Sequence, residues 1–291
     1  MVAEPVDSAC AAGRRAAALR VAVEDPGDPR IADFVGLRDH GLRRRREDVG
    51  GDLAGLFVAE GDVVVSRALR AGYRCRAVLV DGTRRQPVPD DVLAAAEVVY
   101  EAGVRVLERI TGMGVHRGML ATFDRRPLPS VATVLADARR VVVLENVVNP
   151  TNLGVIARTA AAFGVDALLI DRTSCDPLYR RASRVAMGEI FALPYTRVDR
   201  LPGSLTPLVE RGFRLVALTP AADARTLASF AGDLGAEDRV ALLLGAEGHG
   251  LADETMTRCE RVRIPIDPRV DSLNVGAAAA VAMAAISPIR T

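Results

Sequence analysis

The sequence predicts a two-domain α/β protein whose C-terminal domain is built on a parallel sheet. The chain of 291 residues is longer than the roughly 100 to 200 residues of most single domains. Short runs of Val, Leu and Ile alternate with helical segments, as in a parallel sheet covered on both faces. A polar segment with two prolines interrupts this alternation at residues 125–138. We therefore expect a tail over 1–28, a small domain over 29–124, a linker over 125–138 and a larger domain over 139–291.

In the N-terminal half, residues 1–28 are rich in Ala and Arg and end at "EDPGDP", which is typical of a tail. The next residues alternate between helical and strand patterns. The elements expected there are a helix over 30–42, a strand over 56–59, a helix over 61–71, a strand over 77–80 and further alternation that ends near residue 123.

The C-terminal half alternates more regularly. Its strands read as near-continuous apolar runs, which indicates burial on both faces of a sheet. The elements expected are strands over 140–147, 165–171, 213–219, 239–245 and 261–266, helices over 151–164, 180–188, 201–212 and 251–259, and a terminal Ala-rich helix.

The composition is that of an ordinary globular protein, with 49% hydrophobic and 26% charged residues. No apolar run reaches the roughly 18 to 20 residues of a membrane helix, and acids precede the first arginines, unlike a secretory signal. We therefore expect a cytoplasmic protein. Cys10, Cys75, Cys175 and Cys259 lie far apart without a C-x-x-C pair, so we interpret them as reduced structural thiols. The three histidines have no second partner at ligand spacing, so no metal site is expected.

The formal net charge of +1 means that any RNA-binding surface must be a local patch. The best candidate is the run "GLRRRRED", although a solvated helix end is an equally good interpretation of four charges. The chain contains no lysine, and the forked guanidinium of its arginines suits phosphates and base stacking. The residues of this candidate patch are Arg43, Arg44, Arg45 and Arg46.

Three polar stretches follow predicted strands, where ligands bind in open parallel sheets. "NPTNLGVIAR" places Asn152 and Arg158 within two turns of one helix, although Asn149 or Thr151 alone could be a helix N-cap. "LLLGAEGHGL" resembles a phosphate cradle by position, but Glu247 would repel a triphosphate and no Lys-Ser or Lys-Thr pair follows. The fingerprint Gly-x-Gly-x-x-Gly is absent, so a dinucleotide-dependent oxidoreductase is poorly supported.

The third stretch is "RIPIDPRVDSLNVG", which precedes a helix rich in small residues. The simpler alternative for Ser272 is that it is no more than the N-cap of that helix. Asn274 lies beside an apolar helix and needs hydrogen-bond partners of its own when it is desolvated. The polar side chains of this stretch therefore indicate a site.

Taken together and in this order, the three stretches resemble the signature motifs of the SpoU (TrmH-type) branch of the SPOUT RNA methyltransferases. "RVAMGEIFALPY" is similar to the segment between the first two motifs. The N-terminal stretches "GLFVAEGDVVVSRALRAGYRCRAVLV" and "GMGVHRGMLATF" resemble the RNA-binding domain related to ribosomal protein L30e that many ribosomal RNA members carry. The resemblance implies a deep trefoil knot, S-adenosylmethionine as cofactor, a homodimer with a shared active site, and methylation of a ribose 2'-hydroxyl.

Residue by residue, the resemblance implies a catalytic set and a cofactor pocket. Arg158 is the usual catalytic residue of the family, but a guanidinium stays protonated at ordinary pH and is a poor general base. Our hypothesis is that it clamps a phosphate and stabilises developing alkoxide character. The implied catalytic residues are Arg158, Asn152, Glu247, Ser272 and Asn274, and the implied cofactor-binding residues are Gly245, Ile264 and Leu273, with Leu244 and Thr219 beside them.

Two alternatives stay open at this point. The substrate could be transfer RNA, although an L30e-like domain suits the structured loops of ribosomal RNA, with 23S RNA the expected target. The chain could also be an RNA-binding protein with a degenerate knot that binds no cofactor. The intact set of polar motif residues argues against the second alternative.

Overall fold

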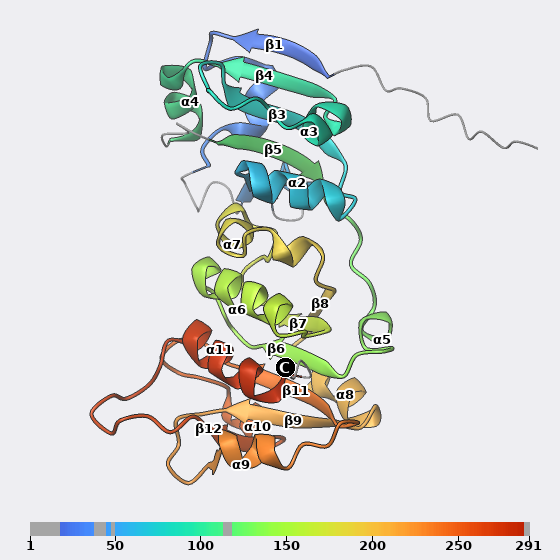
Figure 1. Ribbon diagram of the computed structural model, residues 1–291, viewed down its shortest axis with the longest axis vertical. Coiled ribbons are helices and arrows are strands. Elements are labelled where there is room, and N and C mark those ends of the chain that lie inside the picture. The colour runs from blue at the N-terminus through green and yellow to red at the C-terminus, as the bar shows by residue number, and fades with distance from the viewer. Residues whose placement is uncertain (1–17, 38–44, 48–49, 113–117, 288–291) are drawn as a thin grey trace, which may run out of the picture.

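The computed structural model describes residues 18–37, 45–47, 50–112 and 118–287. Their strands form two sheets, which lie one above the other along the long axis of the molecule (Figure 1). The N-terminal sheet has the order β1-β4-β3-β5-β2, in which β1, β4 and β3 are parallel and β5 is antiparallel to both β3 and β2. Its strands are β1 (Leu19–Val23), β2 (Leu56–Glu60), β3 (Cys75–Asp81), β4 (Val98–Ala102) and β5 (Met119–Asp124), and its helices are η1 (Pro29–Phe34), α2 (Asp62–Arg70), α3 (Asp90–Ala95) and α4 (Val104–Thr111).

The expected tail over residues 1–28 is wrong for its C-terminal part, because β1 belongs to the N-terminal sheet. β1 pairs with β4 from Leu19 opposite Val98 to Val23 opposite Ala102. It is an edge strand, and Leu19 is 66% exposed whereas only Val23 is fully buried. An edge strand that buries one side chain gives little apolar signal in the sequence.

The helix expected over residues 30–42 is shorter in the structure. η1 ends at Phe34, and Val35 is already extended with φ −73° and ψ 137°. Gly36 then takes a φ of +69°, a left-handed conformation that does not continue a helix. Residues 38–42 lie outside the described part of the chain. Ile31 and Phe34 are fully buried and anchor η1 to the sheet.

The C-terminal sheet is parallel throughout, which confirms the predicted fold class. Its order is β10-β12-β9-β11-β6-β7-β8. The strands are β6 (Arg140–Leu144), β7 (Ala167–Asp171), β8 (Tyr195–Val198), β9 (Phe213–Leu218), β10 (Arg225–Thr226), β11 (Arg239–Leu244) and β12 (Glu260–Arg263). The helices are α5 (Val131–Val134), α6 (Pro150–Ala162), α7 (Arg180–Val185), η2 (Glu189–Phe191), η3 (Gly203–Leu205), α8 (Thr206–Glu210), α9 (Leu227–Gly232), α10 (Asp253–Met256) and α11 (Val275–Ile286).

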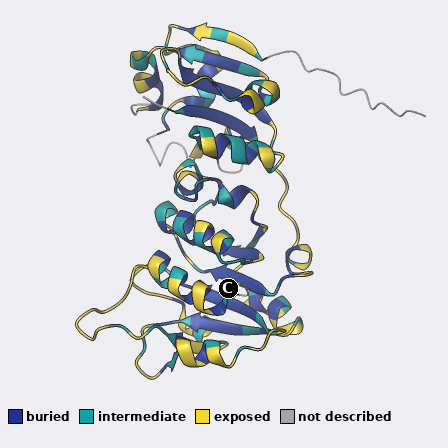
Figure 2. Cartoon of the chain, viewed as in Figure 1, coloured by how far each residue is buried: buried dark blue, intermediate teal, exposed yellow. Residues whose placement is uncertain are grey.

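Both faces of this sheet are covered by apolar layers. On one face, α6 contributes Leu153 and Ile156 and α11 contributes Met283 to a core. On the other face, α8 contributes Leu208 and the loop before α10 contributes Leu251. Figure 2 shows the inner strands of the sheet as mostly buried, and β6 and β7 are buried along their whole length, as their near-continuous apolar sequence runs require, whereas β10 and β12 at one edge are largely half-buried.

The two domains share one apolar core and an ionic contact. Phe57 of β2 lies 5.5 Å, between ring centroids, from Phe191 of η2. At the end of β2, the Glu60 carboxylate accepts hydrogen bonds from Arg180 and Arg184, both on α7. These contacts hold the N-terminal domain against α7 and η2.

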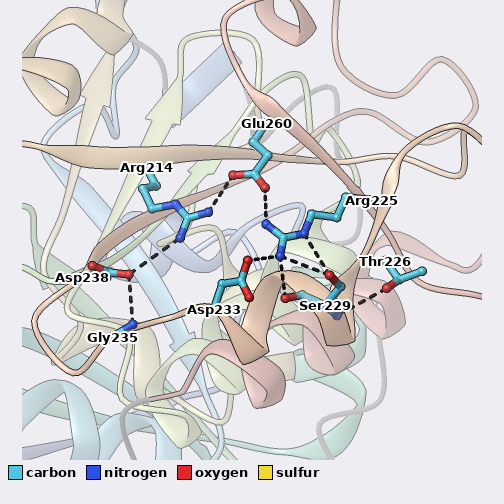
Figure 3. Close-up of polar contacts among 8 residues, drawn as sticks. All are labelled: Arg214, Arg225, Thr226, Ser229, Asp233, Gly235, Asp238 and Glu260. Atoms are coloured by element: carbon cyan, nitrogen blue, oxygen red, sulfur yellow. Dashed lines mark hydrogen bonds and ion pairs between the residues drawn. The ribbon is translucent and has the colours of Figure 1, made fainter.

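The amino edge of the C-terminal sheet carries an ion-pair network (Figure 3). Glu260, at the start of β12, pairs with Arg214 at 2.8 Å and with Arg225 at 3.0 Å. Burial raises the pKa of Glu260, but hydrogen bonds and charge from both arginines outweigh it and hold the pKa below its ordinary value. The network also includes Asp233 and Asp238, and it joins β9, β10 and β12 at the edge opposite the loops that follow the strands.

Among the described residues, no helix is long and apolar enough to span a membrane. α11 is the most apolar helix, and it runs for 12 residues, which is well short of the roughly 20 that a bilayer requires.

Candidate active site at the carboxyl edge of the parallel sheet

The loop after β11 folds back on itself so tightly that its first residue must be glycine. A Cβ added to Gly245 would lie 2.2 Å from both the carbonyl carbon of Gly250 and the nitrogen of Leu251. Ala246 and Gly250 exchange two backbone hydrogen bonds of 3.1 and 3.0 Å. The loop is therefore a closed backbone turn at the carboxyl edge of the sheet.

A cavity of about 550 Å³ lies beside this loop. That volume is within the range of sites for small ligands and cofactors. Three chain segments form its walls, and these segments follow β9, β11 and β12. All five residues of the predicted cofactor pocket line it, namely Thr219, Leu244, Gly245, Ile264 and Leu273.

A chain of hydrogen bonds joins the three polar motifs at this cavity. Asn274 caps α11, because its Oδ1 accepts from the backbone nitrogens of Gly276 at 2.9 Å and Ala277 at 3.3 Å. Its Nδ2 donates to Asn152 Oδ1 at 3.1 Å. Asn152 in turn donates from Nδ2 to Glu247 Oε1. The partners that Asn274 needs are therefore the first turn of α11 and Asn152 of the first motif, which in turn contacts the second motif.

This chain orients the Glu247 carboxylate. Asn152 is buried at 7% exposure, and both polar atoms of its amide are used by its neighbours. Glu247 and Asn274 line the cavity, so the buried amide supports them from behind. The same chain explains the polar start of α6, whose first turns supply this amide.

Ser272 also lines the cavity, whereas Arg158 does not. Ser272 is exposed and precedes the N-cap Asn274, so it is not itself the cap of α11. Arg158 is exposed on α6, and in this one chain the structure does not bring it to Asn152 or Glu247. The two motif residues lie about 120° apart around the helix axis, which places them on different faces.

The structure describes two of the four arginines of the predicted patch. Arg43 and Arg44 lie outside the described residues, as do Cys10, His40 and His116. Arg45 is exposed. Arg46 is not available for RNA, because its guanidinium bonds Asp52 at 2.7 Å and the carbonyl of Ala32 at 3.2 Å. The prediction that Arg46 contacts RNA is corrected to a structural role at the C-terminal end of η1.

Two polar residues near the site, Asn149 and Glu145, fix the backbone around it. Asn149 caps α6 by accepting from the Thr151 nitrogen at 2.9 Å, so the simpler alternative holds for it. Glu145, at the end of β6, accepts from the Ala252 nitrogen at 3.0 Å and the Thr255 hydroxyl at 2.9 Å. Its position directly after a buried strand was the only signal in the sequence that could have found it.

The cysteines of the described residues are free thiols, as expected. Burial raises the pKa of the Cys75 and Cys175 thiols to about 12 and that of Cys259 to about 11. Such thiols are protonated at neutral pH and unreactive. No group of three His, Cys, Asp or Glu side chains that could hold a metal occurs in the part of the chain that the structure describes.

The fold and the site define a class of protein, a parallel α/β domain that holds a small ligand at the carboxyl edge of its sheet. The model of the SpoU rRNA methylase family matches residues 139–284, which is half of the chain. This chain belongs to that family.

Two relatives match most of the chain. An uncharacterized tRNA/rRNA methyltransferase of Mycobacterium tuberculosis is 43% identical over 259 residues, which cover 89% of this chain and 88% of the relative. The 23S rRNA (guanosine-2'-O-)-methyltransferase RlmB of Bordetella pertussis is 32% identical over 232 residues, or 76% of this chain and 91% of the relative.

A solved structure has the same fold. The S-adenosylmethionine-bound rRNA methyltransferase of Sinorhizobium meliloti aligns with a TM-score of 0.74 and 24% identity, over 92% of this chain and 97% of that one. The alignment covers the N-terminal domain as well as the parallel sheet, so the two-domain architecture is shared.

Proposed function

We propose that the protein transfers a methyl group from S-adenosylmethionine to a ribose 2'-hydroxyl of RNA, with 23S ribosomal RNA as the substrate and the cytoplasm as its place of action. The observation that carries the proposal is the hydrogen-bond chain Asn274–Asn152–Glu247 beside the 550 Å³ cavity. The similarity to a 23S rRNA guanosine-2'-O-methyltransferase over 76% of the chain supports the substrate.

The cavity fits the cofactor. Leu244, Ile264 and Leu273 offer apolar walls for an adenine ring, and the backbone of the Gly245 loop offers peptide groups for its polar edge. A Cβ at Gly245 would disrupt this loop. When bound, the cofactor supplies an electrophilic methyl group on a sulfonium.

The reaction requires alignment of the ribose oxygen with that methyl group and removal of one proton. Glu247, held by Asn152, accepts a hydrogen bond from the substrate ribose or from an incoming arginine. Ser272 and Asn274 border the same space and orient the hydroxyl. The proton of the hydroxyl passes to water or to a neighbouring carboxylate, because a guanidinium stays charged.

We also propose a homodimer in which Arg158 of one subunit completes the cavity of the other. Arg158 is exposed and does not line the cavity of its own chain. The outward side of the adjacent α11 carries Ala277 and the 45%-exposed Val281, a small and apolar surface that a second subunit can cover. In that position Arg158 clamps a phosphate and stabilises the developing alkoxide. We also propose that the C-terminal domain contains the deep trefoil knot that the family resemblance implies.

The test is transfer of labelled methyl from S-adenosylmethionine to 23S, 16S and transfer RNA made without modifications. We expect label in 23S RNA at one alkali-stable nucleotide, loss of that label in Arg158→Ala, and normal activity in the control Arg258→Ala on α10's exposed C-terminal side. Label in transfer RNA alone would show that transfer RNA, and not 23S RNA, is the substrate. No label together with no cofactor binding would leave the alternative of an RNA-binding protein with an inactive site.

The alternative substrate rests on one observation. The relative at 43% identity carries a name that includes both tRNA and rRNA, so the RNA fractions above are run side by side.

A further inference from the structure

We propose that RNA is held by an arginine stripe that crosses the domain junction, formed by Arg70 on α2 and by Arg181 and Arg184 on α7, and leading to Arg158 on α6. The inference rests on the proposed function, because it takes RNA as the partner, and it adds where the RNA lies. Figure 1 shows α2, α7 and α6 stacked in this order along the long axis of the molecule. The stripe therefore runs from the N-terminal domain toward the catalytic domain.

Arg158 emerges from α6 between its two neighbouring helices. A Cβ on Gly154 would lie 2.6 Å from the Ala182 carbonyl oxygen, so this side of α6 faces α7. A Cβ on Gly276 would lie 2.9 Å from Val155 Cγ1, so the Val155 side faces α11. Arg158 is about 40° from Gly154 around the helix, between these two directions. Arg158 is thus exposed on the outward face of α6, between α7 and α11.

The arginines of α7 and α2 point outward in the same way. Arg181 and Arg184 are exposed and one turn apart, whereas the two residues between them are buried. Arg70 is exposed in the last turn of α2. One turn earlier, Arg67 donates to the carbonyl of Met187 at 2.6 Å, which fixes that end of α2 directly against the segment that follows α7.

The acidic side chains along this face are already neutralised. Glu60 lies between Arg180 and Arg184, and Glu189 pairs with Arg67 at 2.7 Å. Because these two arginines share one carboxylate, the cluster of Glu60, Arg180 and Arg184 keeps one net positive charge. The arginines of this face that pair with no carboxylate among the described residues are Arg70, Arg158 and Arg181.

Together these charges give the face an excess of about four positive charges, on a chain whose whole formal charge is +1. Successive phosphates of an RNA strand are the ligand that such a row of guanidinium groups fits, because each fork can bond two phosphate oxygens. Since the row ends at Arg158, RNA bound along it reaches the catalytic arginine. The stripe takes the place of the Arg43–Arg46 run as the main RNA contact.

The test compares the double variant Arg70→Gln/Arg181→Gln with a matched control, Arg105→Gln/Arg109→Gln, which removes two exposed arginines from α4. Binding of in vitro transcribed 23S RNA is measured between 50 and 200 mM salt, alongside S-adenosylmethionine binding, thermal unfolding, and the KM and kcat for RNA methylation. We expect the stripe variant to bind RNA at least tenfold more weakly. The slope of log K against log salt falls in magnitude by about 1.4 to 1.8 for the two lost phosphate contacts.

The remaining readouts separate the possible failures. Unchanged cofactor binding and unfolding, with KM raised far more than kcat is lowered, support the stripe. RNA affinity equal to that of the wild type, or an equal loss in the α4 control, overturns it. If the wild-type protein binds 23S RNA in a stripe-dependent way but transfers no methyl group, the proposed function fails and the stripe stands.

Discussion

Replacing Asn152 with Asp tests the hydrogen-bond chain at the site with almost no change in shape. The amide Nδ2 that donates to Glu247 becomes an oxygen, so two carboxylates face each other. The other oxygen can still accept from Asn274, as Asn152 Oδ1 does at 3.1 Å. The substitution therefore changes only the contact with Glu247, where a repulsion between two carboxylates replaces the hydrogen bond.

The size of the effect follows from the surroundings. Two unit charges about 4 Å apart repel by about 4 kcal/mol near a protein surface and by about 1 kcal/mol in bulk water. Because Glu247 is exposed whereas Asn152 is buried, we expect about 1 to 2 kcal/mol of repulsion plus about 1 kcal/mol for the lost hydrogen bond. A loss of about 2 to 3 kcal/mol lowers the Tm by roughly 5 to 10 °C in a domain of this size.

The assay is thermal unfolding of Asn152→Asp, Glu247→Gln and the double variant at pH 8 and pH 5. The double variant restores a donor opposite the new carboxylate, so it should recover most of the lost Tm, with a coupling energy of at least 1 kcal/mol. At pH 5 the single variant should recover part of the loss, because a carboxyl beside another carboxylate takes up a proton more readily. Additive losses with no pH dependence would refute the role given to Asn152.

Three further predictions concern the loop, the thiols and the end of the chain. Gly245→Ala should weaken S-adenosylmethionine binding more than tenfold in calorimetry, because its Cβ would lie 2.2 Å from backbone, whereas Gly203→Ala, with nothing within 4 Å, should bind normally. Since burial raises the pKa of Cys75 and Cys175 from 9.0 to about 12, their stabilising effect is complete below pH 9 and is lost as the pH rises from 9 toward 12. Unfolding in urea should show about 1.4 kcal/mol less stability per thiol at pH 10 than below pH 9. In the Cys75→Ala/Cys175→Ala variant, which lacks both thiols, this contribution to the pH dependence of the unfolding free energy should be absent. Arg140→Met should cost about 2 to 4 kcal/mol in the same assay, because its buried guanidinium donates to the last carbonyl of α11 at 2.7 Å; a loss below 0.5 kcal/mol would contradict this.

The elements that could be predicted from sequence are those with a strong apolar period. The strand expected at residues 56–59 is β2, and the run "RVVVLENV" contains β6, because the apolar residues of both strands are buried. β1 was missed because it buries mainly Val23 at a sheet edge. The two-residue strand β10 was missed because Arg225 and Thr226 have no apolar signal at all.

The candidate site was predictable in its members but not in its arrangement. All five residues of the predicted cofactor pocket line one cavity, because they follow strands that end at the same edge of the sheet. The hydrogen bonds of Asn152 depend on the meeting of α6 with the loop after β11 and with the N-cap of α11, three segments that are far apart in sequence. The exposed position of Arg158 follows from the helical rotation, which the spacing of six residues already contained.

The order of the strands has a consequence for how the enzyme is made. β6 is an inner strand of its sheet, but it pairs on one side with β11, whose residues 239–244 are synthesised about a hundred residues later. The N-terminal domain can fold during synthesis, whereas the parallel sheet must wait for its missing neighbour. Asn274, which anchors Asn152, comes later still, and Arg140 receives its α11 partner only at Ile286. The ligand cavity thus exists only in a finished chain, so a truncated product has no assembled site with which to compete for cofactor.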